Sequence, residues 1–210
     1  MKLKGELKLH PRETAVVVID LQNGCCSPEG LLAKVTKQDT SLIDAMVQIL
    51  PDFLDKMRNR GVAVIWVRTD QSREGMLNNV LEAETLVFGE FFDTCKKGTW
   101  GHDYFGPRPE KQEKEFIKRH PSVFQNQEFE DYLNERGITT LLFAGVFTSR
   151  CVFCSLAGAS ERGYRSILVK DMTANWVEKE YETNAVESII HGMLGFVLDS
   201  LDIIELMQWK

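Results

Sequence analysis

Two residues with the chemistry of a nucleophile and a base stand just beyond apolar runs of this chain. Asp20 directly follows the run at 15–19, and Cys151 lies a few residues after the run at 139–144. A cysteine attacks a carbonyl carbon once a neighbouring group takes its proton, and a carboxylate can be that base. Because ligands of open α/β sheets bind at the carboxyl ends of strands, Asp20 and Cys151 are candidate catalytic residues.

The apolar runs have the composition of strands that are buried on both faces of a parallel sheet. Runs of this kind predict four strands, at residues 15–19, 62–67, 139–144 and 166–169. A shorter run predicts a last strand at 195–198. Apolar residues at helical spacing predict connecting helices at 41–60, 128–136 and 183–193. Pro51 either kinks the first of these helices or divides it into two.

The alternation of strand, helix, glycine and strand is typical of βαβ units. We expect one α/β domain over residues 1–210, with a doubly wound, mostly parallel sheet of about six strands and helices on both faces. Residues 71–115 are the least periodic part and are expected to carry loops and a short helix.

The charge balance argues against several classes of function. The chain has 25 Lys and Arg against 31 Asp and Glu, a net charge of −6. This offers no broad basic surface, so we expect neither nucleic acid nor a membrane as a partner. Residues 1–6 have no apolar segment behind them that would mark a secretory signal. Five cysteines are an odd number and not dense in a chain of this length, which fits reduced thiols better than a disulfide framework, so we expect a cytoplasmic protein.

Three motifs stand in order along the chain: IDLQN at 19–23, KRHPSVF at 118–124 and GVFTSRCV at 145–152. With them, the chain resembles the isochorismatase-like cysteine hydrolases. This superfamily includes nicotinamidases, carbamoylsarcosine amidohydrolase and ureidoacrylate amidohydrolases. The resemblance extends over residues 14–174.

The resemblance implies a catalytic triad of Asp20, Lys118 and Cys151. In this interpretation Asp20 takes the thiol proton, and Cys151 forms a thioester with the substrate. We expect Lys118 and the amino terminus of a helix at 152–162 to lower the pKa of the Cys151 thiol.

The resemblance also implies an oxyanion site in the loop before the nucleophile. Backbone N–H groups of the loop with Val146, Phe147 and Cys151 would stabilise the oxyanion. The cis peptide bond that is common in the family corresponds here to Val146–Phe147.

Several further residues are candidates for substrate binding: Gln22, Cys25, Trp100, Phe147 and Arg150. The family often has aspartate and phenylalanine where this chain has Gly24 and Cys25, which predicts an altered or wider pocket. Arg150 could pair with a substrate carboxylate or with a neighbouring subunit, and the sequence leaves both open.

No metal or cofactor is expected. Nicotinamidases carry an Asp-x-His metal motif after the second strand, whereas Asp70 is followed here by Gln71 and Ser72. The histidines are scattered without metal-ligand spacing, at His10, His102, His120 and His191. Nicotinamide is therefore not the expected substrate.

Together these features predict a metal-independent cysteine hydrolase that cleaves a C–N bond of a small amide or ureido substrate. Relatives are often dimers or tetramers, so a homo-oligomer is expected by analogy. Three alternatives stay open. One is a vinyl-ether hydrolase of the isochorismatase type, and another is a non-catalytic scaffold. The third is a redox protein that uses Cys151 and Cys154 as a Cys-x-x-Cys pair.

Overall fold

A six-stranded sheet forms the centre of the molecule in the computed structural model, which describes residues 7–207. Its strands pair in the order β3-β2-β1-β4-β5-β6, and every pairing is parallel. The strands are β1 (Thr14–Ile19), β2 (Ala63–Thr69), β3 (Lys114–Lys118), β4 (Thr140–Val146), β5 (Arg165–Ala174) and β6 (Phe196–Leu198). This order is that of a doubly wound sheet, as the sequence predicts.

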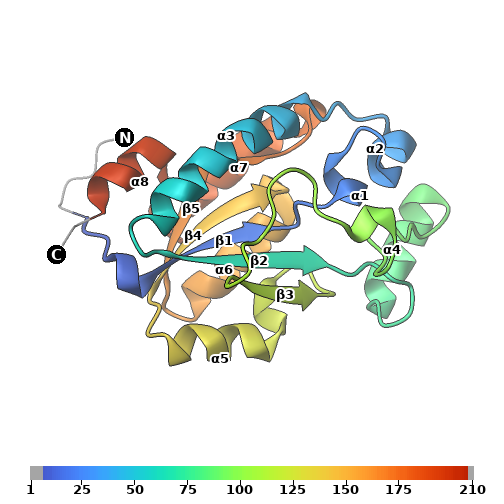
Figure 1. Ribbon diagram of the computed structural model, residues 1–210. Coiled ribbons are helices and arrows are strands. Elements are labelled where there is room, and N and C mark those ends of the chain that lie inside the picture. Colours follow the sequence, from blue (N-terminus) through green and yellow to red (C-terminus); the bar gives the residue numbers. More distant parts are fainter. Residues whose placement is uncertain (1–6, 208–210) are drawn as a thin grey trace.

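Helices lie on both sides of the sheet, with α3 on one side and α5 on the other in Figure 1. The longer helices are α3 (Ser41–Arg58), α4 (Asn78–Phe88), α5 (Gln127–Glu135), α6 (Phe153–Glu161) and α7 (Glu180–Ile190). The shorter ones are α1 (Asn23–Cys26), α2 (Leu31–Thr36) and α8 (Ser200–Leu206). No helix within residues 7–207 is long and apolar enough to cross a membrane.

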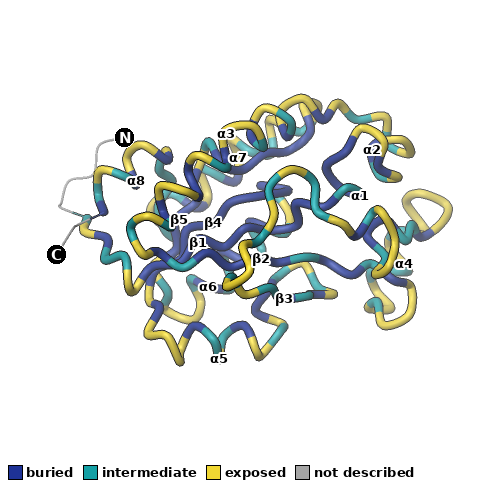
Figure 2. Tube along the Cα trace, viewed as in Figure 1, coloured by how far each residue is buried: buried dark blue, intermediate teal, exposed yellow. Residues whose placement is uncertain are grey.

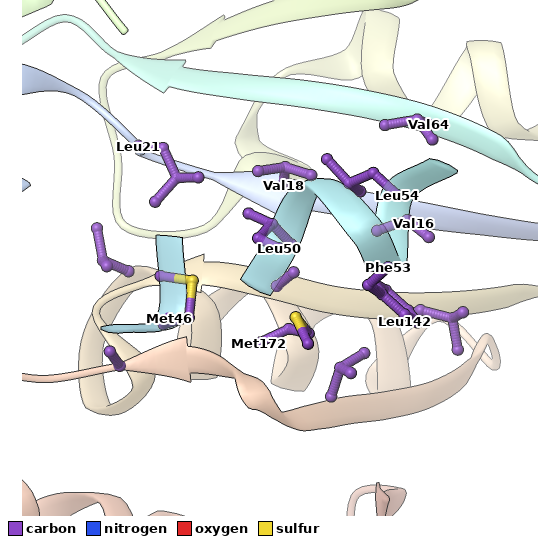
Figure 3. Close-up of a cluster of buried hydrophobic side chains, with 14 of the residues drawn as sticks. Val16, Val18, Leu21, Met46, Leu50, Phe53, Leu54, Val64, Leu142 and Met172 are labelled. Carbon is purple, nitrogen blue, oxygen red and sulfur yellow. The ribbon is translucent and has the colours of Figure 1, made fainter. Parts of the chain in front are cut away.

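Two hydrophobic clusters fill the spaces between the sheet and its helices. Successive side chains of β1 point to opposite faces, so Val16 and Val18 pack on one cluster and Val17 on the other. The first cluster includes α3 and α8 residues, and Figure 3 shows Leu50 among them. The second includes residues of α5, α6 and α7. The central strands β1 and β4 are accordingly buried along their length, while the outer helix faces are exposed (Figure 2).

The structure corrects or completes the predicted elements at several places. The edge strand β3 lies within a charge-rich stretch that carries little strand signal. Helix α3 continues through Pro51 without division. The helix predicted at 152–162 is preceded by a π-helical turn, η4 (Thr148–Val152). The predicted short helix of the 71–115 excursion is α4. The prediction about a secretory signal concerns residues 1–6, which lie outside the described residues.

Candidate active site

Three side chains from three separate elements meet at the carboxyl edge of the sheet. Asp20 follows β1, Lys118 ends β3 and Cys151 lies in the η4 turn after β4. The Lys118 Nζ atom lies 2.7 Å from Asp20 Oδ2 and 3.2 Å from Cys151 Sγ. The side chains of the ion pair are almost completely buried, at 1% exposure for Lys118 and 3% for Asp20. The structure therefore brings together all three residues of the predicted triad.

Asp20 is positioned by an unusual backbone turn at the end of β1. Its φ angle is +53°, in the left-handed region that non-glycine residues rarely adopt. Its N–H still donates to the Val67 carbonyl on β2, at 2.9 Å. One carboxylate oxygen, Oδ2, pairs with Lys118, whereas Oδ1 has no hydrogen-bond partner within residues 7–207. Such strain at a defined site supports a functional role for the Asp20 carboxylate.

The pKa of the Cys151 thiol is raised, and the expectation that it would be lowered is wrong. Burial is the main cause, and the Asp20 carboxylate adds to it, while the Lys118 ammonium offsets only part of the effect. Burial and the Asp20 carboxylate thus both favour the neutral thiol over the thiolate. The sequence shows the cation and the helix, but it does not show burial of the sulfur.

Lys118 remains a cation in this environment. Burial alone would lower the pKa of its ammonium group. The neighbouring Asp20 carboxylate and Cys151 sulfur outweigh that effect and raise this pKa. Lys118 therefore gives the buried Asp20 carboxylate a cationic partner 2.7 Å away.

The loop between β4 and Cys151 has a demanding geometry. Gly145 has a φ of +106°, and a Cβ atom there would lie 2.1 Å from the Ile19 carbonyl oxygen, so only glycine fits. The next peptide bond, Val146–Phe147, is cis, as the resemblance implies. Cys151 then lies inside the π-helical turn instead of opening an α-helix. Turns of this kind are frequent at functional sites.

A second set of contacts holds the η4 turn from the side of β5. The Asn175 Oδ1 atom accepts hydrogen bonds from the N–H and hydroxyl groups of Ser149, and Asn175 Nδ2 donates to Thr183. From the sequence, strand β5 is expected to end at 169, before the polar pair Lys170-Asp171, so Asn175 is not among the predicted site residues. The strand in fact continues to Ala174, and the apolar residues after this polar pair are the sequence feature that indicates its continuation.

Arg150, which directly precedes Cys151, packs near two aromatic rings. The Phe147 ring packs on Trp176, with their centroids 4.4 Å apart. The exposed Arg150 guanidinium lies 5.2 Å from the Trp176 ring and 5.7 Å from Phe147. Arg150 and Trp176 line a cavity of about 80 Å³, together with Glu84 of α4.

A family model described as an isochorismatase domain matches residues 14–200, which is most of the chain. The chain belongs to the isochorismatase family of hydrolases. The match includes all three residues that meet at the carboxyl edge of the sheet. It confirms the family that the three sequence motifs indicated.

Individual comparisons agree with this family. A ureidoacrylate amidohydrolase from Azorhizobium caulinodans is 28% identical over 207 residues, which cover 91% of this chain and 88% of that protein. A "probable inactive nicotinamidase" from Arabidopsis thaliana is 26% identical over 179 residues, 84% of this chain and 88% of the relative. A crystal structure of a cysteine hydrolase from Pseudomonas syringae pv. phaseolicola 1448A superposes with a TM-score of 0.80. It covers 97% of this chain and 98% of its own, and at 20% identity it supports the fold.

Two other candidate residues of this isochorismatase-family protein, Gln22 and Trp100, form hydrogen bonds with other segments of the chain. Gln22 is fully buried, and its side-chain amide exchanges two hydrogen bonds with the backbone of Thr69. Its Nε2 atom also lies 3.1 Å from His102 Nδ1. Gln22 therefore ties the segment after β1 to the end of β2. Trp100 is 53% exposed, and its carbonyl accepts a hydrogen bond from Asn23.

The segment at Gly24-Cys25, where the chain departs from the family, packs closely against the loop that carries Thr94 and Cys95. A Cβ atom on Gly24 would lie 2.0 Å from the Thr94 carbonyl oxygen, so the loop that carries Thr94 already fills this space. Cys25 is buried, and its Sγ atom contacts Cys95 Sγ at 3.3 Å. The space that the missing side chain would take is occupied by the backbone of Thr94.

Asp70, which follows β2, forms hydrogen bonds and an ion pair with other residues of the chain. Asp70 accepts hydrogen bonds from Ser72 and Lys97 and pairs with Arg119 at 2.9 Å. Burial would raise the pKa of its carboxyl, but these partners outweigh it and lower that pKa. Within residues 7–207 no three His, Cys, Asp or Glu side chains gather as a group that could hold a metal ion.

Proposed function

We propose that this protein is a cysteine hydrolase that cleaves a C–N bond of a small amide or ureido substrate and releases ammonia or an amine. The observation that carries the proposal is the Lys118 ammonium in contact with both Asp20 and Cys151. In this proposal Asp20 is the base and Cys151 the nucleophile, and the Lys118 ammonium contacts both of them. The name of the Azorhizobium relative, an amidohydrolase, supports the same bond type.

The first half of the proposed reaction forms a thioester. Asp20 takes the Sγ proton as the Cys151 sulfur attacks the carbonyl carbon of the substrate. Backbone N–H groups of the 146–151 loop stabilise the negative oxygen of the tetrahedral intermediate. When the C–N bond breaks, the proton moves from Asp20 to the departing nitrogen.

The second half releases the acyl or carbamoyl group. Asp20 takes a proton from a water molecule, and the resulting hydroxide attacks the thioester carbon. The C–S bond then breaks, and Asp20 returns the proton to the Cys151 sulfur. A thiol that is neutral in the free protein suits this cycle, because the same proton is shuttled by Asp20 in each half.

A screen of small amides and ureas for ammonia release tests the proposal. The wild type should release ammonia from at least one of them, and Cys151→Ala should release none. Cys154→Ser is the matched control, because Cys154 lies outside the proposed triad and this variant should keep full activity. Loss of turnover in Cys154→Ser instead would favour the redox alternative.

The vinyl-ether alternative makes the opposite prediction for the nucleophile. Hydrolysis of isochorismate depends on the aspartate more than on a thiol. If Cys151→Ala keeps full turnover on a vinyl ether while Asp20→Asn has none, the amidohydrolase proposal is wrong. A folded wild type without turnover on either substrate class would support the scaffold alternative.

Three further expectations from the sequence belong with this proposal. We propose a single domain, a cytoplasmic location and a homo-oligomer, either a dimer or a tetramer. We also propose that turnover needs no metal or other cofactor. Light scattering on the purified protein measures the oligomeric state, and dialysis against a chelator should leave turnover unchanged.

A further inference from the structure

Two buried thiols that are distant in the sequence touch each other in the interior of the protein. Cys25 and Cys95 are separated by 70 positions, and their Sγ atoms lie 3.3 Å apart, where either thiol can donate its hydrogen to the other. Cys25 belongs to α1, and Cys95 lies in the loop that follows α4. Their exposure is 5% and 0%. The proposed hydrolysis uses neither thiol, so the pair is chemistry that the active site leaves unexplained.

The backbones that carry the two thiols approach each other closely. A Cβ atom on Gly24 would lie 2.0 Å from the Thr94 carbonyl oxygen and 2.9 Å from Cys95 Sγ. The side-chain amide of Asn23 donates to the Trp100 carbonyl at 3.0 Å, which fixes α1 to the same loop beyond the thiols. A disulfide requires two backbones that are close and side chains that face each other. The sulfur atoms need only move from their contact to a bond of about 2 Å.

The segment before Cys95 is loosely held, which gives a small oxidant a way in. Helix α4 (Asn78–Phe88) buries none of its own residues, and Figure 1 shows it at the periphery of the molecule. Regions with few buried contacts open locally at a small free-energy cost. Opening of this segment would uncover the pair, and Cys25 is the thiol that is already slightly exposed.

We propose that Cys25 and Cys95 form a disulfide bond when the protein meets a peroxide. The Cys25 sulfur attacks one peroxide oxygen and the O–O bond breaks, so that hydrogen peroxide leaves a sulfenic acid on Cys25 and one water. The Cys95 sulfur then attacks the Cys25 sulfur, the S–O bond breaks, and the Cys95 proton leaves with the hydroxide as a second water. The two thiols together lose two electrons, and the peroxide gains them.

This bond joins the loop after α4 to the segment that begins at the base of the proposed reaction. Cys25 follows Asp20 by five positions, and the Cys26 thiol beside it donates to the Asp20 carbonyl at 3.7 Å. Closing a loop of 70 positions restricts the unfolded chain much more than the folded one. We therefore expect the oxidised protein to melt at least about 5 °C higher than the reduced protein.

Disulfide mapping tests the proposal. The reduced, folded protein is treated with hydrogen peroxide, its remaining thiols are blocked with iodoacetamide, and it is digested with trypsin without reduction. Cys25 lies in the tryptic peptide 13–34 and Cys95 in the peptide 74–96. We expect the two peptides as one species, lighter than their sum by two hydrogen atoms, which dithiothreitol separates.

Substitutions assign the bond to one pair of sulfur atoms. Cys26 shares the peptide of Cys25, so Cys26→Ala is the matched control and should keep the cross-link. Cys25→Ala and Cys95→Ala should each lose it together with the rise in melting temperature. Fragment spectra of the wild-type cross-link identify the bonded residue of the Cys25-Cys26 pair without any variant. Cys151→Ala should still form the bond, because the proposal does not depend on the hydrolase activity.

Three results would overturn the proposal. The first is a pair of reduced thiols at Cys25 and Cys95 after treatment that oxidises Cys151, including the case in which Cys151–Cys154 is the only disulfide. The second is a cross-link of the two peptides that persists in Cys25→Ala. The third is a melting temperature that does not rise on oxidation, because a bond that forms without displacing α1 or the loop has to stabilise the fold.

Discussion

Lys118 contacts two groups of the site at once, the Asp20 carboxylate and the Cys151 sulfur. A buried ion pair of this kind is costly to break, because the remaining charge stays in a poorly solvated place. The pair therefore affects stability as well as chemistry. The two effects can be separated by comparing substitutions at buried and exposed ion pairs.

Lys118→Met should lower the free energy of unfolding by about 3–5 kcal/mol and abolish turnover, since it leaves Asp20 buried without its cation. Urea denaturation measures the stability. Lys170→Met is the control, because the Lys170 side chain is 51% exposed in its ion pair with Glu187. That substitution should cost at most about 1 kcal/mol. Equal costs for the two variants would contradict the importance of the buried pair.

Asp20→Asn should separate thiol reactivity from catalysis. The Asp20 carboxylate raises the pKa of the Cys151 thiol, so its removal lowers that pKa and increases the thiolate fraction at any pH below it. We therefore expect Asp20→Asn to speed the alkylation of Cys151 by iodoacetamide while it abolishes ammonia release. In the wild type, the alkylation rate should still rise with pH above about 8.5, where an ordinary thiol begins to level off.

Peptide mapping of the alkylated protein measures the rate of Cys151 alkylation in the wild type and in Asp20→Asn. Slower labelling of Cys151 in Asp20→Asn than in the wild type would show that Asp20 activates the thiol in the resting protein.

The sequence could identify the residues of this site through their motifs. It could not give the direction of the Cys151 pKa, since that depends on burial and on the approach of Asp20, which comes from a distant part of the chain.

At the scale of elements, the site depends on how closely two strands approach. Gly145 of β4 pairs with Ile19 of β1, directly before Asp20. The left-handed φ at Gly145 and the nearby Ile19 carbonyl both exclude a side chain. The position of Asp20 therefore depends on a glycine that is distant in the sequence.

Gly145→Ala should cost at least about 3 kcal/mol of stability, since it adds a clash with the backbone to an unfavourable φ. Gly163→Ala is the matched control, because Gly163 also has a positive φ, +82°, but has no atom within 4 Å of an added Cβ. We expect about 1–2 kcal/mol there. Thermal or urea unfolding measures the stability of both variants. Similar losses of stability would mean that the Ile19 backbone leaves room for a Cβ atom at position 145.

The elements that the sequence predicted well are those with long apolar runs. Strands β1, β2 and β4 are buried on both faces and carry a strong signal. The edge strand β3 has only two apolar residues, Phe116 and Ile117, among its five positions and does not alternate, so it carries little signal among the surrounding charges. This matters for function because β3 carries Lys118. Only the resemblance to a family pointed to that residue.

Across the whole molecule, the five cysteines occupy very different environments. Cys25, Cys26 and Cys95 are buried in the core, whereas Cys151 and Cys154 are partly exposed. Burial is also the main cause that raises the pKa of the Cys26 thiol. We expect iodoacetamide to modify only Cys151 and Cys154 in the folded protein, and all five cysteines in urea. Labelling of Cys25 or Cys95 under native conditions would contradict the packing described here.

The three site residues come together in space only because of the order of the strands in the sheet. Asp20, Lys118 and Cys151 are far apart in the sequence, and the parallel order β3-β2-β1-β4 brings their strand ends to one edge. The alternation of strands and helices was enough to predict the type of fold. The order of the strands, and with it the contact of Lys118 with both other residues, required the structure.

A burst experiment tests the central claim, that Cys151 is a nucleophile that forms a covalent intermediate. An activated carbamate with a nitrophenolate leaving group acylates quickly, so the intermediate should accumulate. The account predicts a burst of about one nitrophenolate per chain, with a carbamoyl group on Cys151 in the quenched protein and no burst in Cys151→Ala. Steady turnover without a burst and without modification of Cys151, or a burst that persists in Cys151→Ala, would contradict it.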